Sequence, residues 1–257
     1  MGSLIRGAAL TLRRMGAAYL VKEALRRLTG RPYAYRGILI DNATAFRVAR
    51  ALAPAVWRQG DMVFFRGKFG TFAAPRLEMF SVFAEDLEGM YGALDVRDRT
   101  VADVGAYLGE TAVFFARRGA KYVYAYEPVF YKYAEFNIGL NGVKAEVRPY
   151  GLGVEEDVLH VKPANTATGL APGPLEIRVR PLAEALMQAD AVKMDCEGCE
   201  WALLAVPCGA VRNAEEYVVE VHGPAPQLLR KMEKCGFKSK PLKSWTPLLS
   251  VWHFVKA

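Results

Sequence analysis

From about residue 100 onward, apolar and polar positions along this chain follow two alternating rhythms. Short apolar runs at 101–104, 122–126 and 191–194 are typical of strands buried in a parallel sheet. The segments at 110–118 and 131–140 instead repeat apolar residues at helical spacing. Strands that alternate with helices predict an α/β fold with a doubly wound parallel sheet. Further strands are predicted at 145–149, 158–161, 175–179 and 217–221.

The chain finishes with two more strand-like runs. These runs, at 236–238 and 248–255, are joined by a short connection that contains Pro241 and Pro247. We expect them to form an antiparallel hairpin at one end of the sheet. The predicted core is therefore a Rossmann-like sheet of seven strands, and a dehydrogenase would need a second half that this chain lacks.

The first part of the chain has a different pattern. One side of a helical projection is apolar, with Arg6, Arg13 and Arg14 opposite. The apolar side consists of Ile5, Ala8, Ala9, Leu12, Met15, Gly16 and Tyr19. We expect this amphipathic helix to bend near residue 21, to end around Gly30, and to dock onto the core or a partner chain. The predicted domains are 1–74, a basic helix with an accessory segment, and 75–257, the sheet domain.

Within the accessory segment and just after it, shorter elements are expected. A helix is predicted at about 43–53, a pair of strands at 61–66 and 68–73, and a helix over 75–91 that leads into the first core strand.

Charge is distributed unevenly. The net charge is +7, but residues 1–50 hold ten Lys/Arg against Glu23 and Asp41, a local +8, so that the remainder sums to −1. A polyanion or a membrane surface would therefore meet this first segment, although a solvated basic face explains the same residues. The apolar runs are too short or too broken by charge to span a bilayer, and a soluble protein is expected.

The most informative motif is VADVGAYLGE at 101–110, followed by YAYEP at 124–128. Two glycines permit a tight turn between strand and helix, and an acid that ends the second strand can accept hydrogen bonds from a ribose. An acid that begins the turn would repel a pyrophosphate but suits a cationic cofactor that carries an amino acid. The preferred cofactor is S-adenosylmethionine, and the sheet resembles that of class I methyltransferases. The predicted contacts are Asp103, Gly105, Ala106, Tyr107, Gly109, Glu127 and Pro128.

Two later strands place polar groups at the edge of the sheet where ligands bind. Lys193, Asp195 and Glu197 follow one another at the end of one strand, and His222 ends the next. We predict these four residues as catalytic, with His222 as the base that removes a hydroxyl proton. Asp195 would orient the acceptor, or help to hold a divalent ion with Glu220 and His222. A buried ion pair at Lys193 and a structural role for His222 are the alternatives.

All four cysteines lie in the last quarter of the chain, at 196, 199, 208 and 235. A single Cys-x-x-Cys pair does not predict zinc, so no metal site is predicted, and small buried side chains explain Cys196 and Cys199. A disulfide that involves Cys208 or Cys235 stays open, and a reducing cytoplasm is the expected location. The loop at 162–174 could form a lid that carries Asn165, Thr166 and Thr168.

Three blocks, VADVGAYLG, YAYEP and VKMDCEGCEW, resemble the signature of FkbM-type methyltransferases. The resemblance covers about residues 75–255 and implies an S-adenosylmethionine-dependent enzyme, often acting on hydroxyl groups of sugars or natural products. It implies that Asp103, Gly105 and Gly109 form the cofactor loop and that Glu127 contacts the ribose. Lys193, Asp195, Glu197 and Glu200 match the third block. Tyr107 stands where the family pattern has Asn, and the basic first segment is not part of that pattern.

The leading hypothesis is O-methylation of a hydroxyl on a sugar or small molecule. The alternatives are a methyltransferase that binds tRNA through residues 1–50, and a non-catalytic interaction module with the same fold. Assembly into a homo-oligomer through the first helix is a further expectation.

Overall fold

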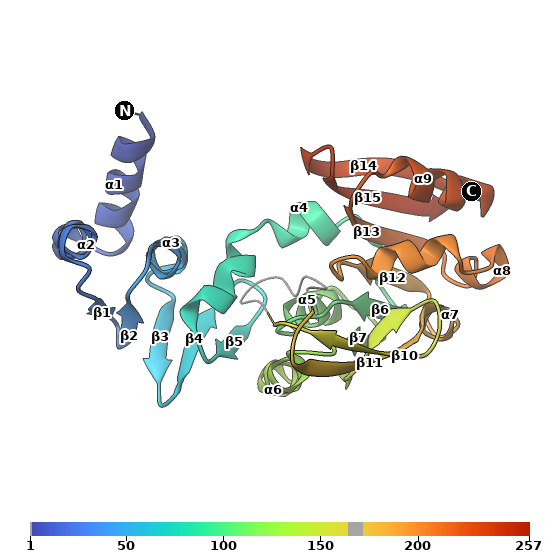
Figure 1. The fold of residues 1–257 in the computed structure, drawn as a ribbon, viewed down its shortest axis with the longest axis horizontal. Helices are drawn as coiled ribbons and strands as arrows, with labels where there is room; N and C mark the ends of the chain where they lie inside the picture. Colours follow the sequence, from blue (N-terminus) through green and yellow to red (C-terminus); the bar gives the residue numbers. More distant parts are fainter. Residues whose placement is uncertain (1, 164–171) are drawn as a thin grey trace. The chain divides into compact units, whose positions relative to one another are not determined.

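The computed structural model describes residues 2–163 and 172–257, and these form two compact units (Figure 1). The first unit is Met1–Glu85 and the second is Asp86–Ala257. The division falls after Glu85, whereas the sequence placed it after residue 74. The reason is that the 3-10 helix Leu77–Ala84 (η1) packs against α3 and β5 of the first unit.

The first unit combines helices with two small antiparallel sheets. Strands β1 and β2 form a hairpin, and β3, β4 and β5 form a three-stranded sheet in chain order. Its elements before η1 are α1 (Gly2–Arg14), α2 (Ala17–Thr29), β1 (Tyr33–Tyr35), β2 (Ile38–Ile40), α3 (Ala43–Leu52), β3 (Val56–Gln59), β4 (Met62–Arg66) and β5 (Thr71–Ala74). The short helix and the strand pair predicted for this region are present, and β1, β2 and β3 are additional strands.

The predicted first helix is in fact two helices. The break lies at Gly16, whose φ of +99° favours glycine, rather than near residue 21. The predicted apolar side is also not the buried one, because Ala8, Ala9 and Leu12 are exposed while Thr11 and Met15 are buried. The end of α2 at Thr29, with Gly30 in the left-handed conformation, agrees with the sequence.

The predicted helix over 75–91 is divided as well. After η1, helix α4 (Leu87–Tyr91) begins anew, because the Asp86 side chain accepts a hydrogen bond from the Gly89 N–H at 3.0 Å and caps it. Helix α4 opens the second unit.

The second unit is built on a seven-stranded sheet whose order is β14-β15-β13-β12-β6-β7-β8. Strands β6, β7, β8, β12 and β13 are parallel, and the β14–β15 hairpin closes one edge in antiparallel pairing. The Rossmann-like seven-stranded sheet and its terminal hairpin are confirmed. Its strands are β6 (Thr100–Val104), β7 (Tyr122–Tyr126), β8 (Ala145–Arg148), β12 (Ala191–Met194), β13 (Glu216–His222), β14 (Phe237–Thr246) and β15 (Leu249–Lys256).

Two of the predicted strands lie outside this sheet. A separate three-stranded sheet has the order β10-β11-β9. It consists of β9 (Gly151–Gly153), β10 (Asp157–Val161) and β11 (Leu175–Pro181).

Helices cover the main sheet (Figure 1). Helices α5 (Glu110–Arg117) and α6 (Tyr131–Asn141) pack against β6, β7 and β8. A continuous apolar core joins other sheet residues, such as Val104 and Met194, to the remaining helices. These are α7 (Leu182–Leu186), η2 (Cys199–Leu204), α8 (Cys208–Val211) and α9 (Pro226–Lys234). Among the described residues, we find no helix that has both the length and the apolar character to cross a membrane.

Candidate active site

The carboxyl ends of the central strands meet at one edge of the sheet. Val104 of β6 pairs with Tyr126 of β7 and with Met194 of β12, and Met194 pairs with Val219 of β13. In an open α/β sheet this edge is where ligands bind. All of the residues predicted for cofactor binding and catalysis lie in these strands or in the segments that follow their carboxyl ends.

The turn after β6 is shaped by a close backbone approach. Gly105 has φ +79°, and a Cβ there would lie 1.7 Å from the carbonyl oxygen of Asp195. The N–H groups of Gly105 and Ala106 both donate to the carbonyl of Tyr126, at 2.9 and 3.2 Å. The glycine therefore allows the end of β12 to contact the turn, and these two N–H groups fasten the turn to β7.

Asp103 and Lys193, which occupy paired positions of β6 and β12, form a buried ion pair. Their charged atoms are 3.2 Å apart, and both side chains are at most 1% exposed. Lys193 also donates to the carbonyl of Gly105 at 2.6 Å, while Asp103 accepts from the Thr111 hydroxyl at 2.7 Å. Burial opposes the charged form of Lys193, but Asp103 and the nearby acids outweigh it and raise the pKa.

Glu110 begins α5 beside this pair and is also buried. Burial raises the pKa of its carboxyl to about 8, against the opposing effects of hydrogen bonds and Lys193. Its carboxylate oxygen accepts a hydrogen bond from the Leu108 N–H at 3.0 Å. The Glu110 side chain therefore stabilises the turn between β6 and α5 through this hydrogen bond.

Glu127 lies at the end of β7, as predicted, and Pro128 follows it. Its carboxylate accepts three backbone hydrogen bonds, from Tyr107 at 3.0 Å, Val129 at 2.7 Å and Phe130 at 2.9 Å. Burial raises the pKa of this buried acid, while the three N–H donors oppose the rise. A carboxylate has about four acceptor positions, so one is left beyond these three bonds.

Tyr107 adopts a positive φ of +45°, which is uncommon for a residue other than glycine. Asn tolerates this conformation better than Tyr does, which gives a backbone reason for Asn at this point of the family pattern. The Tyr107 ring packs edge-on against Phe130, with centroids 5.1 Å apart.

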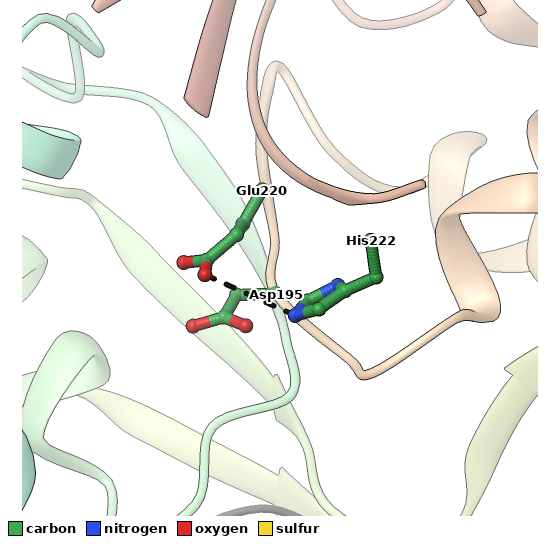
Figure 2. Close-up of side chains that lie close together, drawn as sticks. All are labelled: Asp195, Glu220 and His222. Carbon is green, nitrogen blue, oxygen red and sulfur yellow. Dashed lines mark ion pairs between the residues drawn. The ribbon is translucent and has the colours of Figure 1, made fainter. Parts of the chain in front are cut away.

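A polar cluster lies at the ends of β12 and β13. Figure 2 shows Asp195, Glu220 and His222 pointing toward one another, and each can offer one ligand atom within 4.8 Å of the others. The Tyr91 hydroxyl lies 2.8 Å from an Asp195 oxygen and 3.3 Å from a Glu220 oxygen. The three side chains could bind a divalent cation or exchange a proton with an acceptor.

His222 is held by a second acid behind it. Its Nδ1 lies 3.2 Å from an oxygen of the fully buried Glu200, which also accepts the His222 backbone N–H at 2.8 Å. Its Nε2 lies 3.5 Å from Glu197 and 3.8 Å from Glu220. Burial opposes the charged ring, but the hydrogen bond to Glu200 and the surrounding carboxylates raise the pKa of His222 to about 9.

Glu197 and Gly198 form the bend that follows Asp195. Glu197 has φ +56°, an uncommon conformation of the kind that often occurs at functional sites. The Glu197 side chain is half-buried, and burial raises the pKa of its carboxyl, although His222 opposes the rise. Glu200 completes the bend by accepting the Gly198 N–H at 2.9 Å.

All four cysteines are paired. Cys196 bonds to Cys199 across this bend, and Cys208 bonds to Cys235, so that no free cysteine exists in the described parts of the chain. The second bond was left open by the sequence. The first corrects the view of Cys196 and Cys199 as merely small buried side chains, because the bend brings the two thiols together.

The structure brings Asp195, Glu197 and His222 together, whereas Lys193 points away from them into the pair with Asp103. The predicted lid residues Asn165, Thr166 and Thr168 lie outside the described residues. The sequence did not identify Tyr91 or the Glu200–His222 contact. The sequence named Glu220 only as an alternative cation ligand with Asp195 and His222, although alternation along β13 puts it on the same side as His222.

Comparison with known families gave a match to the Methyltransferase FkbM domain over residues 103–239. A search of curated proteins found no match. Solved structures with a similar fold include a ribosomal protein L11 methylase from Lactobacillus delbrueckii, at 15% identity and TM-score 0.41, which covers 66% of this chain and 76% of that one.

Two further structures are similar. TYW2 of M. jannaschii, in complex with AdoMet, is 14% identical with TM-score 0.42, covering 78% of this chain and 89% of that one. A precorrin-6y methyltransferase from Geobacter metallireducens is 12% identical with TM-score 0.42, covering 71% and 90%. At such low identity, the acceptors named for those proteins do not transfer to this chain.

Proposed function

The chain belongs to the FkbM methyltransferase domain family, and we propose that it uses S-adenosylmethionine to methylate a hydroxyl group of a sugar or another small molecule. The observation that carries the proposal is the polar cluster of Asp195, Glu220 and His222 beside the turn after β6. Methyl transfer to a hydroxyl requires a group that positions the acceptor and a group that receives its proton. This cluster offers both.

The cofactor would be held by the turn at 103–109 and by Glu127. The residues present fit such a ligand, because Glu127 keeps one acceptor position for a ribose hydroxyl beyond its three backbone bonds. S-adenosylmethionine supplies a methyl group on a positively charged sulfur, which the acidic strand ends favour. Gly105, Ala106, Tyr107, Gly109 and Pro128 are proposed to shape this binding edge.

The acceptor hydroxyl is proposed to lie against Asp195 and His222. Asp195 would accept a hydrogen bond from the acceptor while Tyr91 holds the other side of the carboxylate. His222 would receive the proton at Nε2, because Nδ1 is engaged by Glu200. Glu197 would stabilise the protonated ring from 3.5 Å. Each of these groups is at hydrogen-bonding or ion-pair distance from another, so the site is preorganised for proton removal.

Lys193 takes a positioning role in this proposal instead of a catalytic one. Its ammonium group is sealed against Asp103 and the Gly105 carbonyl, and it therefore holds the turn after β6 against the end of β12.

An assay for methyl transfer tests the proposal. The protein would be incubated with S-adenosylmethionine that carries a labelled methyl group, together with one candidate acceptor in each reaction. The candidates are glycosides, phenols and tRNA. We expect label in a hydroxyl-bearing small molecule, and a large loss of transfer in Asp195→Asn and His222→Gln. Label found in tRNA alone would contradict the proposed acceptor class. If Asp195→Asn and His222→Gln both kept full biological activity, the alternative of a non-catalytic interaction module would be supported.

A further inference from the structure

The exposed face of helix α2 is apolar. Consecutive residues of a helix are 100° apart, so exposed residues at i, i+4 and i+7 lie on one side. Val21, Leu25 and Leu28 have this spacing and are 61%, 53% and 82% exposed. Ala17, Ala18 and Ala24 of the same side are exposed too. We call Val21, Leu25 and Leu28 the apolar face, and Leu12 of α1 is 53% exposed as well.

The buried side of α2 carries charge instead. Glu23 is the buried residue of this helix, and its carboxylate pairs with Arg26 at 2.8 Å and with Arg27 at 2.7 Å. Burying a carboxylate is costly unless it is paired, whereas leucine gains free energy when it leaves water. Because α2 buries its carboxylate and exposes its leucines, the leucine side of the helix is suited to binding a partner outside this chain's own core.

The exposed charged residues of α1 and α2 are all basic. Arg6, Arg13, Lys22 and Arg27 are exposed on α1 and α2, and Glu23 is the one acid that the sequence contains between residues 2 and 29. A partner for this surface must therefore offer apolar volume and negative charge side by side.

An anionic lipid bilayer has both properties. We propose that α1 and α2 lie in the interface of an anionic membrane, with the apolar face below the headgroups and the arginines and Lys22 on the lipid phosphates. Each helix has 13 residues and is about 20 Å long, too short to cross a bilayer, so it would lie in the membrane plane. This inference goes beyond methyl transfer and does not depend on it.

Other partners fit the surface less well. An RNA would use the basic residues but leave the exposed leucines in water. A second copy of the chain would bring two uniformly positive surfaces together, which costs free energy.

Vesicle flotation tests the proposal with the full chain, in the absence of cofactor and acceptor. One set of vesicles is phosphatidylcholine alone, and the other contains equal parts of phosphatidylcholine and phosphatidylglycerol. We expect binding to the anionic vesicles, weakened by salt. The triple variant Val21→Ser/Leu25→Ser/Leu28→Ser should bind them about tenfold or more weakly. Arg13→Gln and Lys22→Gln should each weaken binding about fivefold.

Met187→Ser is the matched control, because Met187 is 64% exposed but belongs to the second unit. It should bind vesicles as the wild type does. Circular dichroism checks that the triple variant is folded, and Leu28→Ser alone, at the most exposed position, gives a milder second test.

Several results would overturn the proposal. These are absence of binding to anionic vesicles, equal binding by the triple variant, or a dimer in solution that the triple variant abolishes without any vesicle binding. RNA binding that survives the triple substitution, with no vesicle binding, would also overturn it and favour the nucleic-acid alternative. Because no methyl transfer is measured, these results leave the proposed reaction untouched.

Discussion

Two sets of charged residues lie at the same edge of the main sheet, and they differ in how completely they are enclosed. Asp103 and Lys193 are sealed, and each has its partners within the protein. Asp195, Glu197 and His222 are only partly buried, and their polar atoms face one another across a small cluster. The residue types are similar in both sets. Enclosure therefore separates the residues that hold the strands in place from those that can meet a substrate.

The largest expected effect is on the contact that joins the two sets. Gly105→Ala would drive a Cβ to within 1.7 Å of the Asp195 carbonyl, so the end of β12 must move or the protein must unfold. Gly109→Ala is a matched control with nearly the same φ, +80°, but its Cβ would lie 3.1 Å from its nearest neighbour. Thermal unfolding should show a far greater decrease in melting temperature for Gly105→Ala than for Gly109→Ala. Equal losses would mean that backbone conformation alone requires the glycine.

The sealed pair should matter for stability. Lys193→Met leaves Asp103 charged and unpaired in the interior, and we expect a loss of about 3–5 kcal/mol in the free energy of unfolding. The double variant Lys193→Met/Asp103→Leu removes both charges and should recover part of that loss. Denaturant unfolding measures both. A Lys193→Met protein of wild-type stability would show that the pair is not structural.

The open set should matter for activity instead. Asp195→Asn and His222→Gln should lower kcat by about 10²–10⁴-fold, the usual contribution of a positioned acid or base. Their free energies of unfolding should change by only about 1 kcal/mol, because both side chains are partly exposed. If either variant lost stability and kcat did not fall specifically, Asp195 and His222 would be structural residues like Asp103 and Lys193.

The pH dependence sharpens the role of His222. The ring must be neutral to accept a proton, and its pKa is raised to about 9, so activity should increase with pH up to about that value. Glu200→Gln removes the carboxylate that holds Nδ1, so the pKa of His222 should fall toward its usual value of about 6.5. The rising limb of the kcat profile should then move to lower pH.

Two results would contradict this assignment. One is a rising limb that stays in place in Glu200→Gln. The other is activity that disappears on treatment with a chelator and returns with Mg²⁺, which would favour a bound cation at Asp195, Glu220 and His222.

Local pattern was sufficient for most of the sheet and for part of the site. The alternation of buried strands and helices from residue 100 predicted all five parallel strands, because each strand has its own apolar signal. The positions of Asp103, Glu127, Asp195 and His222 at strand ends followed from the same signal.

Contacts between distant segments were out of reach. The sequence assigned Glu200 to the third family block, yet its carboxylate contacts His222, which lies 22 residues later on β13. Lys193 lies next to the acidic turn in sequence, but pairing of β12 with β6 turns it toward Asp103. In α1, the predicted apolar side is largely exposed at Ala8, Ala9 and Leu12, while Thr11 and Met15 are the buried residues. Each case depends on which partner tertiary structure supplies.

Binding of S-adenosylmethionine at the turn after β6 and Glu127 can be measured by calorimetric titration of this cofactor, and of its demethylated product, into the wild-type protein. We expect saturable binding of both ligands, about tenfold weaker in Glu127→Gln, because a hydrogen bond to a charged acceptor is lost. His222→Gln should bind the cofactor as the wild type does. If neither ligand bound to the folded wild-type protein, this edge of the sheet would not be a site for S-adenosylmethionine.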